Sequence, residues 1–182
     1  MSKIRRLGAL ATLALILAAG GAAAQVRDGS HDFDFLPGTW HTHIKRVLDP
    51  LEGGGHTVTM DGTVTERRVA NGHAWQEDIS VDGPDGHWDG VTVFLYDPKS
   101  GQWSQTFAGA TDGRFSPPTV GSFHDGTGQL YGTDTYNGRQ VLLRGTWSGI
   151  TPDAHDYTES YSDDGGKTWA PAFIAHLTRV KP

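Results

Sequence analysis

The sequence predicts an all-β fold, a single antiparallel meander barrel of about ten strands. Glycine contributes 25 of the 182 residues, and the chain carries six Trp, five Tyr and seven Phe, a composition rich in both turn formers and strand formers. Short runs of β-branched and aromatic residues alternate with turn clusters, most of them about 8 to 12 residues apart, which is typical of a meander. No segment shows sustained helical periodicity, and we expect at most a single helical turn near residues 31–36.

The chain begins with the pattern of a secretory signal peptide. A basic start containing Arg5-Arg6 precedes an apolar run from Leu7 to Ala19, and Ala22-Ala23-Ala24 provides an A-x-A cleavage site. The apolar run is shorter than the roughly 20 residues that a membrane span needs. We therefore expect residues 1–24 to be removed and residues 25–182 to form one β-barrel domain. The mature protein is expected to be periplasmic or secreted, with no membrane anchor.

Turn clusters divide the mature chain into the expected strands. The clusters supply Gly or Asn where a tight turn requires positive φ, and they lie at Asn71-Gly72, 82–86, 97–101, 125–128, Asn137-Gly138 and 163–166. The runs between them predict strands at 39–48, 56–69, 73–82, 89–97, 102–109, 119–125, 129–136, 139–147, 154–162 and 168–180.

A barrel is favoured over a β-sandwich because it leaves no strand edge unpaired. Hairpin-linked strands can form either architecture, and strands of even length suit the barrel. About ten strands enclose a space wider than side chains alone readily fill. The predicted barrel is therefore expected to contain a cavity.

Strict alternation along three strands indicates which side chains face the interior. In residues 74–81, 102–109 and 155–161, one side of each strand is apolar and aromatic. Seven side chains on these sides form the predicted lining of a ligand-binding site: Trp75, Glu77, Trp103, Phe107, Tyr157, Glu159 and Tyr161.

Glu77 and Glu159 are the chemically informative members of that set, because burial among aromatic side chains raises a carboxyl pKa toward neutral. Three roles are open for them. They can form hydrogen bonds to Arg68, Arg144 or a tyrosine hydroxyl inside a filled barrel, recognise a polar group of a ligand, or act in acid–base catalysis.

Gly38-Thr39-Trp40 opens the first expected strand, and Arg179 lies in the last. This pair resembles the G-x-W pattern of lipocalins and other calycins, in which the tryptophan closes the barrel base and an arginine from the final strand packs on it. The segments FDFLPGTW, YDPKSGQWSQTF and ESYSDDGGKTW, with a last strand ending in LTR, resemble secreted bacterial proteins of the lipocalin-like family called domain of unknown function 1579.

This resemblance spans residues 32–180. It implies a lipocalin-like barrel in which Gly38, Trp40 and Arg179 are structural, and it implies no activity, substrate or catalytic residue. The disulfide usual in lipocalins is missing, because the chain has no cysteine.

Charge and composition exclude several classes of function. The formal charge of −6 becomes more negative once the basic leader is removed, which disfavours nucleic acid as a partner. Without cysteine there is no thiolate nucleophile or thiolate metal ligand. No Ser-His-Asp spacing, phosphate-binding glycine loop or H-E-x-x-H motif is present. Ser162 to Trp169 matches an Asp-box, which in a single copy predicts a structural turn.

Three histidines leave a metal or haem alternative open. His41 and His43 project to the same side of one strand, and His176 can join them where the first and last strands meet. An interior His176 is also what a haem-binding barrel of the nitrobindin type would use. Alternation places His176 and Arg179 on opposite faces, so one of the two must point outward. We therefore expect neither a metal nor a cofactor.

The sequence favours a binding protein over an enzyme. The expected function is an exported lipocalin-like barrel that binds a small, partly apolar molecule in its interior. Two alternatives remain: a barrel isomerase or hydrolase that uses a buried glutamate, and a solid barrel that acts through its surface.

Overall fold

Ten antiparallel strands make up most of the computed structural model, which describes residues 27–181. The predicted signal peptide lies outside the described residues. The strands are β1 (Gly38–Val47), β2 (Thr57–Val69), β3 (Ala74–Gly83), β4 (Gly86–Asp97), β5 (Gln102–Gly109), β6 (Thr119–His124), β7 (Thr127–Tyr136), β8 (Arg139–Ser148), β9 (Ala154–Ser162) and β10 (Ala170–Arg179). A single 3₁₀ turn, η1 (Ala70–Gly72), joins β2 to β3. Each strand lies where the sequence predicts it, with ends that differ by at most three residues.

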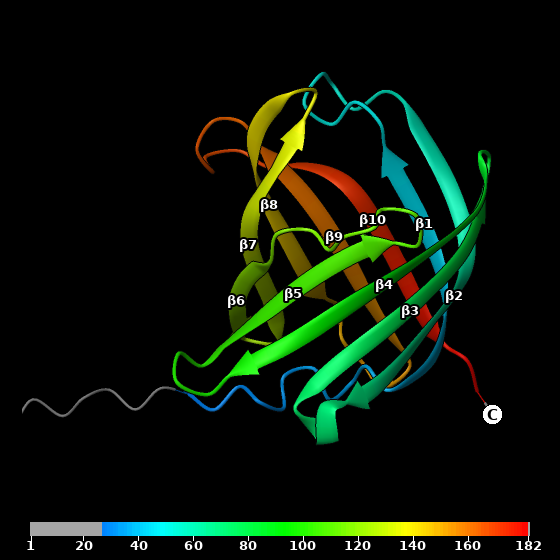
Figure 1. The fold of residues 1–182 in the computed structure, drawn as a ribbon. Coiled ribbons are helices and arrows are strands. Elements are labelled where there is room, and N and C mark those ends of the chain that lie inside the picture. The colour runs from blue at the N-terminus through cyan, green and yellow to red at the C-terminus, as the bar shows by residue number, and fades with distance from the viewer. Residues whose placement is uncertain (1–26, 182) are drawn as a thin grey trace, which may run out of the picture.

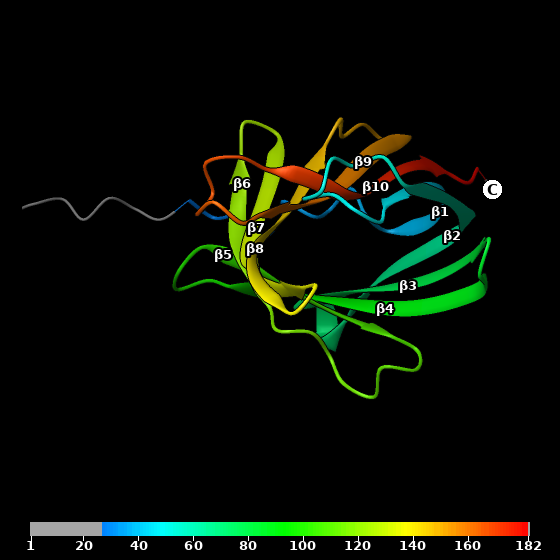
Figure 2. The ribbon, with the colours of Figure 1, turned by 90° about the horizontal axis from the view of Figure 1, so that it is seen from above.

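The strands close into a barrel in chain order, because β1 pairs with β10 as well as with β2 (Figure 1). The predicted meander barrel is confirmed, and the sandwich alternative is wrong. Seen from above, the barrel is flattened, with β3 and β4 across from β1, β9 and β10 (Figure 2). The β5–β6 pairing is the shortest, with three residue pairs from Trp103–Gly121 to Gln105–Thr119.

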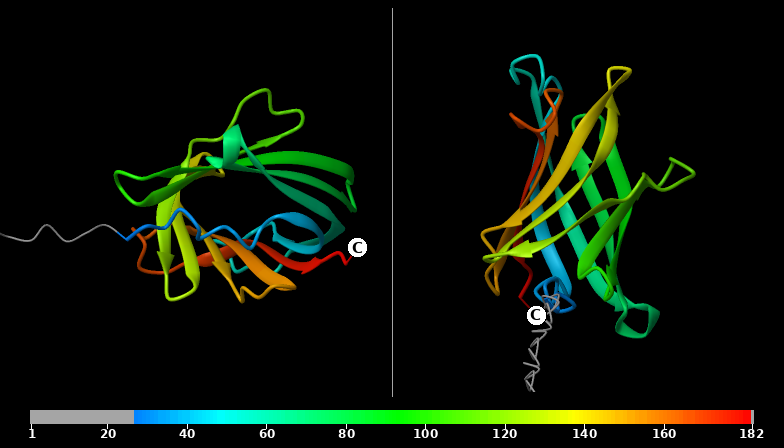
Figure 3. Two further views of the ribbon diagram at one scale, coloured as in Figure 1. Left: turned by 90° about the horizontal axis from the view of Figure 1, so that it is seen from below. Right: turned by 90° about the vertical axis from the view of Figure 1, so that its left-hand side faces the viewer.

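The segment before β1 closes one end of the barrel, across which it runs in Figure 3. The ring of Phe33 is fully buried there, and its centroid lies 4.8 to 5.1 Å from those of Phe94, Trp103, Phe123 and Trp147. Three consecutive i to i+3 backbone hydrogen bonds between Gly29 and Leu36 shape this segment as a series of turns, where the sequence suggested one helical turn. Aromatic packing thus plugs the base.

Trp40 and Arg179 form a second layer at the base. The Arg179 guanidinium carbon lies 4.0 Å from the centroid of the Trp40 ring, and its N–H groups donate to the carbonyls of Phe35, Pro37 and Pro152. Gly38 has φ of +124°, and a Cβ there would lie 2.7 Å from Arg179 Nη1. The contact that the G-x-W resemblance implies is present, and it requires glycine at the first position.

The opposite end of the barrel is its mouth, formed by the β1–β2, β3–β4, β7–β8 and β9–β10 connections (Figure 1). In the β9–β10 connection, the Asp164 carboxylate accepts hydrogen bonds from the backbone N–H groups of Lys167 and Thr168 and from the Ser162 hydroxyl. The Asp-box is therefore a structural turn. Within residues 27–181, no helix has the length and apolar character to cross a membrane.

Candidate functional site

A cavity of about 620 Å³ occupies the barrel interior. All ten strands contribute to its lining, and exposed residues such as Leu48, Asp85 and His87 line it at the mouth, so it opens to solvent. The alternative of a solid barrel, filled by its own side chains, is therefore wrong. A volume of this size falls in the range of small-molecule sites.

Two glutamates oppose each other near the base end of the cavity. Glu66 on β2 and Glu77 on β3 are cross-strand partners, which places their Cβ atoms about 5 Å apart. Glu66 is 3% exposed, and its Oε2 has no hydrogen-bond partner within the described chain. Burial, with a smaller effect of Asp78, raises the pKa of Glu77 to about 7; burial and the charge of Glu77 raise the pKa of Glu66 well above its ordinary value. Both shifts favour the protonated form of the carboxyl concerned.

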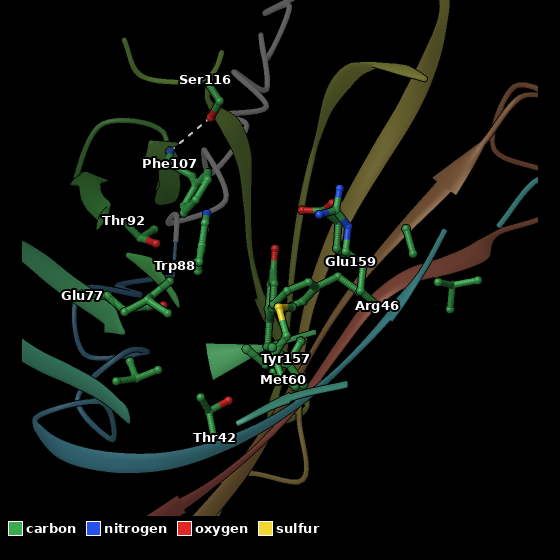
Figure 4. A pocket seen from close by; sticks show the side chains of 18 of the residues that line it. Thr42, Arg46, Met60, Glu77, Trp88, Thr92, Phe107, Ser116, Tyr157 and Glu159 are labelled. Atoms are coloured by element: carbon green, nitrogen blue, oxygen red, sulfur yellow. Dashed lines mark hydrogen bonds between the residues drawn. The ribbon is translucent and has the colours of Figure 1, made fainter. Parts of the chain in front are cut away.

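Glu159 lies on β9 with two tyrosines of the same strand. Burial and the charge of Asp134 raise the pKa of Glu159 to about 7, while hydrogen bonding with Tyr161 and Tyr157 and the charge of Arg46 act in the opposite direction. The Tyr161 hydroxyl also donates to Asp134 Oδ2 at 3.0 Å. Figure 4 shows Glu159 beside Arg46, across the cavity from Glu77. Glu159 thus has polar neighbours that Glu66 lacks.

Thr42 and His155 add two further unpaired polar groups to the lining. Both side chains are at most 3% exposed, and neither Thr42 Oγ1 nor His155 Nδ1 has a hydrogen-bond partner among residues 27–181. The His155 ring packs edge-on to Trp40 and Phe35, at centroid distances of 4.6 and 5.1 Å. Burial lowers the pKa of His155 to about 4, so its imidazole is neutral at pH 7. Polar groups buried without a partner cost about 1–3 kcal/mol each, which a polar molecule in the cavity can offset.

The rest of the wall is apolar. Trp88 and Phe107 stack at a centroid distance of 5.7 Å, and Met60, Ile79 and Phe173 also line the space. Trp88 and Phe107 lie on the same side as Glu77 in Figure 4, away from Tyr157. An apolar wall with a few polar groups is the usual lining of a small-molecule site.

Five of the seven predicted lining residues line the cavity: Glu77, Phe107, Tyr157, Glu159 and Tyr161. Trp75 and Trp103 do not. Both face inward as alternation predicts, but they lie below the cavity in the buried cluster around Phe33, each 2% exposed. Arg68 covers Trp75 at 4.5 Å, and Trp103 donates to the Gly29 carbonyl. Alternation gives the face of a residue and says nothing of its height along the barrel.

Sequence reasoning missed Glu66, Trp88 and Arg46 as lining residues. A signal for Glu66 was present, because the period of two that runs from Val58 through Met60 and Val64 continues to Glu66. The sequence predicts the fourth strand over residues 89–97, which leaves Trp88 between the turn cluster at 82–86 and that strand. The structure starts β4 at Gly86 and directs Trp88 into the barrel.

The three histidines considered for metal or haem lie on the outer wall. His43 and His176 are cross-strand partners, and each imidazole bonds a flanking carboxylate, His43 to Asp61 at 2.7 Å and His176 to Asp156 at 2.6 Å. Their neighbours Ala175 and Leu177 line the cavity, so His176 points away from it and the interior haem arrangement is wrong. Within the described residues, no three His, Asp or Glu side chains lie close enough together to hold a metal ion, and this applies to His41 as well.

Comparison with known proteins identifies the fold. No protein-family model and no curated protein matches the chain. Among solved structures, the S-type phycobiliprotein lyase from Guillardia theta matches with a TM-score of 0.57 at 13% identity, over 86% of this chain and 94% of the lyase chain. EF1p2_mFAP2b bound to DFHBI matches at 0.46 with 13% identity, over 84% and 99% of the two chains. A de novo designed fluorescence-activating β barrel matches at 0.44 with 13% identity, over 85% and 99%. The lyase match shows the fold alone, a closed antiparallel barrel like that of lipocalins, and the two weaker matches add nothing to it.

Proposed function

We propose that this protein is an exported lipocalin-like barrel that binds a small, partly apolar molecule in its interior. One observation carries the proposal: the barrel encloses an open cavity of about 620 Å³, and Thr42, Glu66 and His155 of its lining each have a buried polar atom with no hydrogen-bond partner within residues 27–181. Apolar walls supply affinity by removing ligand surface from water, and a few polar groups fix its orientation. Glu77 and Glu159, with Phe107, Tyr157 and Tyr161, are the proposed ligand contacts.

The resemblance to domain of unknown function 1579 and the expected export are parts of the same proposal. The base motif of Gly38, Trp40 and Arg179 supports the lipocalin-like kinship. Export rests on the signal-peptide pattern of residues 1–24. Intact-mass analysis of protein recovered from the periplasm or medium should give a chain that begins at Gln25, and retention of Met1 would contradict export with cleavage.

Binding is tested with the uncharged fluorescent probe N-phenyl-1-naphthylamine. We expect the fluorescence of the probe to rise when it is mixed with the protein. Energy transfer from tryptophan to the bound probe is also expected, because Trp88 and Trp147 line the cavity. Replacing Trp88 with Phe should reduce that energy transfer without abolishing binding.

A matched pair of variants locates the probe. Ala175→Phe places a ring in the cavity and should weaken probe binding roughly tenfold. Ile174, the preceding residue on β10, faces outward, so Ile174→Phe should change the affinity for the probe by less than about twofold. Equal affinity in both variants, or no binding by the parent protein, would refute the proposed function.

An acid–base enzyme is a second candidate, favoured by the pKa values of about 7 for Glu77 and Glu159 in an open cavity. A general base is most effective when its pKa lies near the operating pH. The probe reaction is proton abstraction from 5-nitrobenzisoxazole, whose rate should rise with pH through a midpoint near 7 and fall in Glu77→Gln or Glu159→Gln. A rate equal to that of buffer would remove this candidate.

A further inference from the structure

The charged groups that line the cavity are unbalanced toward acid. Five carboxyl side chains contribute to the wall: Glu66, Glu77, Asp85, Asp134 and Glu159. The basic groups are Arg46, His87 and His155. Arg46 is exposed and its charge acts on Glu159; His87 is bonded to Asp82 and Asp89 at the mouth; and the buried His155 is neutral. None of these three groups is among those that shift the pKa of Glu66 or Glu77.

Among residues 27–181, Arg179 is the one basic group whose charge shifts the pKa of a member of this pair, and it acts from the base side. Its charge lowers the pKa of Glu66, but its guanidinium donates to the carbonyls of Phe35, Pro37 and Pro152 and is absent from the cavity lining. One guanidinium can offset the charge of one carboxylate. The second carboxylate of the pair needs either a proton or one further cation.

Resting on the proposed function, we infer that the ligand is an amphipathic amine whose ammonium group binds at the Glu66–Glu77 pair, with its apolar part extending toward the mouth. Glu66 Oε2 is a buried acceptor with no partner within the described chain, and Glu77 lies directly across the strand pair from it. An ammonium group brings three donors and one positive charge. It therefore supplies both what the unpaired oxygen lacks and what the second carboxylate needs.

The wall between this pair and the mouth determines the rest of the ligand. Trp88, Phe107, Met60 and Phe173 make it apolar, as Figure 4 shows for the first three. Binding there removes the apolar surface of an alkyl or aryl chain from water, which is favourable. This stretch of the wall offers no partner for a second charged group of the ligand. An anionic ligand of the same shape is disfavoured by the carboxyl groups of the lining.

Amine binding also moves a proton. The raised pKa values of Glu66 and Glu77 favour a proton on the free pair, whereas an ammonium group beside the pair favours its ionised form, so binding releases up to about one proton per ligand to the buffer. A neutral alcohol that only fills the space requires no ionisation. Proton release therefore separates recognition of charge from occupation of the cavity.

The first experiment uses the unaltered protein at pH 7 and follows displacement of N-phenyl-1-naphthylamine by octylamine, 1-octanol and octanoate. We expect octylamine to displace the probe at a concentration roughly tenfold or more below that of octanol, with octanoate the weakest. Displacement by octanol as strong as by octylamine would overturn the amine inference and leave the proposed binding function standing. Failure of the probe and of all three ligands to bind would overturn both.

The second experiment locates the charge. Glu77→Gln should weaken the affinity for octylamine roughly tenfold and change the affinity for octanol by less than about twofold. Glu159→Gln should weaken octylamine binding less, because the carboxyl of Glu159 already has polar neighbours in Tyr157, Tyr161 and Arg46. Calorimetry of the unaltered protein in phosphate and in Tris should give different apparent enthalpies for octylamine and equal ones for octanol. Equal enthalpies for octylamine in the two buffers would contradict its binding at the protonated pair.

Discussion

Replacing Glu77 with Gln should stabilise the protein at alkaline pH and leave its stability nearly unchanged at pH 4. Burial raises the pKa of Glu77 from 4.5 to about 7 in the folded state. A carboxyl with a raised pKa holds its proton more tightly when folded, so its contribution to stability is fully present below pH 4.5 and is lost as the pH rises to 7. Glutamine resembles the protonated acid and keeps that contribution at every pH.

The size of the effect follows from the same shift. Each pKa unit corresponds to about 1.4 kcal/mol, so the shift of Glu77 amounts to about 3 kcal/mol at pH 8, an upper value because water in the open cavity reduces the penalty of ionisation. His155 has the opposite effect, because its pKa is lowered from 6.5 to about 4 in the folded state. Its contribution to stability is present above pH 6.5 and is lost as the pH falls toward 4. Both proteins contain His155, so subtracting the free energy of unfolding of the parent from that of the variant at each pH removes the effect of His155.

The assay is urea denaturation followed by tryptophan fluorescence at pH 4 and pH 8. Asp153→Asn is the matched control, because it makes the same change from a carboxyl to an amide at a side chain that is 67% exposed. A Glu77→Gln variant no more stable than the parent at pH 8 would refute the conclusion that folding raises the pKa of Glu77.

Three further predictions concern the frame of the barrel. Arg179→Ala should lower the free energy of unfolding by about 1–3 kcal/mol, because the variant loses packing on Trp40 and several hydrogen bonds. The control Arg139→Ala removes only exposed ion pairs at 3.7 Å and should lower it by less than about 0.5 kcal/mol; equal losses would contradict a stabilising contact between Trp40 and Arg179. Phe33→Ala should cost about 3–5 kcal/mol in the same denaturation assay, because it empties the aromatic plug, and a cost below about 1 kcal/mol would show that the plug is dispensable. Asp164→Ala should speed hydrogen exchange of the Thr168 amide, measured by NMR, and an unchanged rate would contradict the role of Asp164 in the turn.

Local signals were enough to predict the frame. Period-two alternation and Gly or Asn turns are properties of neighbouring residues, so the ten strands and the inward direction of Glu77 and Glu159 could be predicted from the sequence. The contact of Trp40 with Arg179 required a resemblance, because these residues are far apart in the chain.

Properties that depend on the whole barrel could not be predicted. Trp75 and Trp103 face inward yet lie below the cavity, because the preceding segment inserts Phe33 between the walls and fills the base. The pairing of Glu66 with Glu77 depends on the register of β2 against β3, and a shift of one residue would reverse which face each shows. The sequence could not give that register.

The most direct test of ligand binding in the barrel is a crystal structure of the protein with 4-(4-bromophenyl)butylamine, recorded at the bromine absorption edge. We expect one strong anomalous peak inside the barrel on the mouth side of Trp88, with the amine end of the molecule at Glu66 and Glu77. A bromine peak confined to the outer wall, with the interior occupied by water alone, would contradict a ligand site in the barrel.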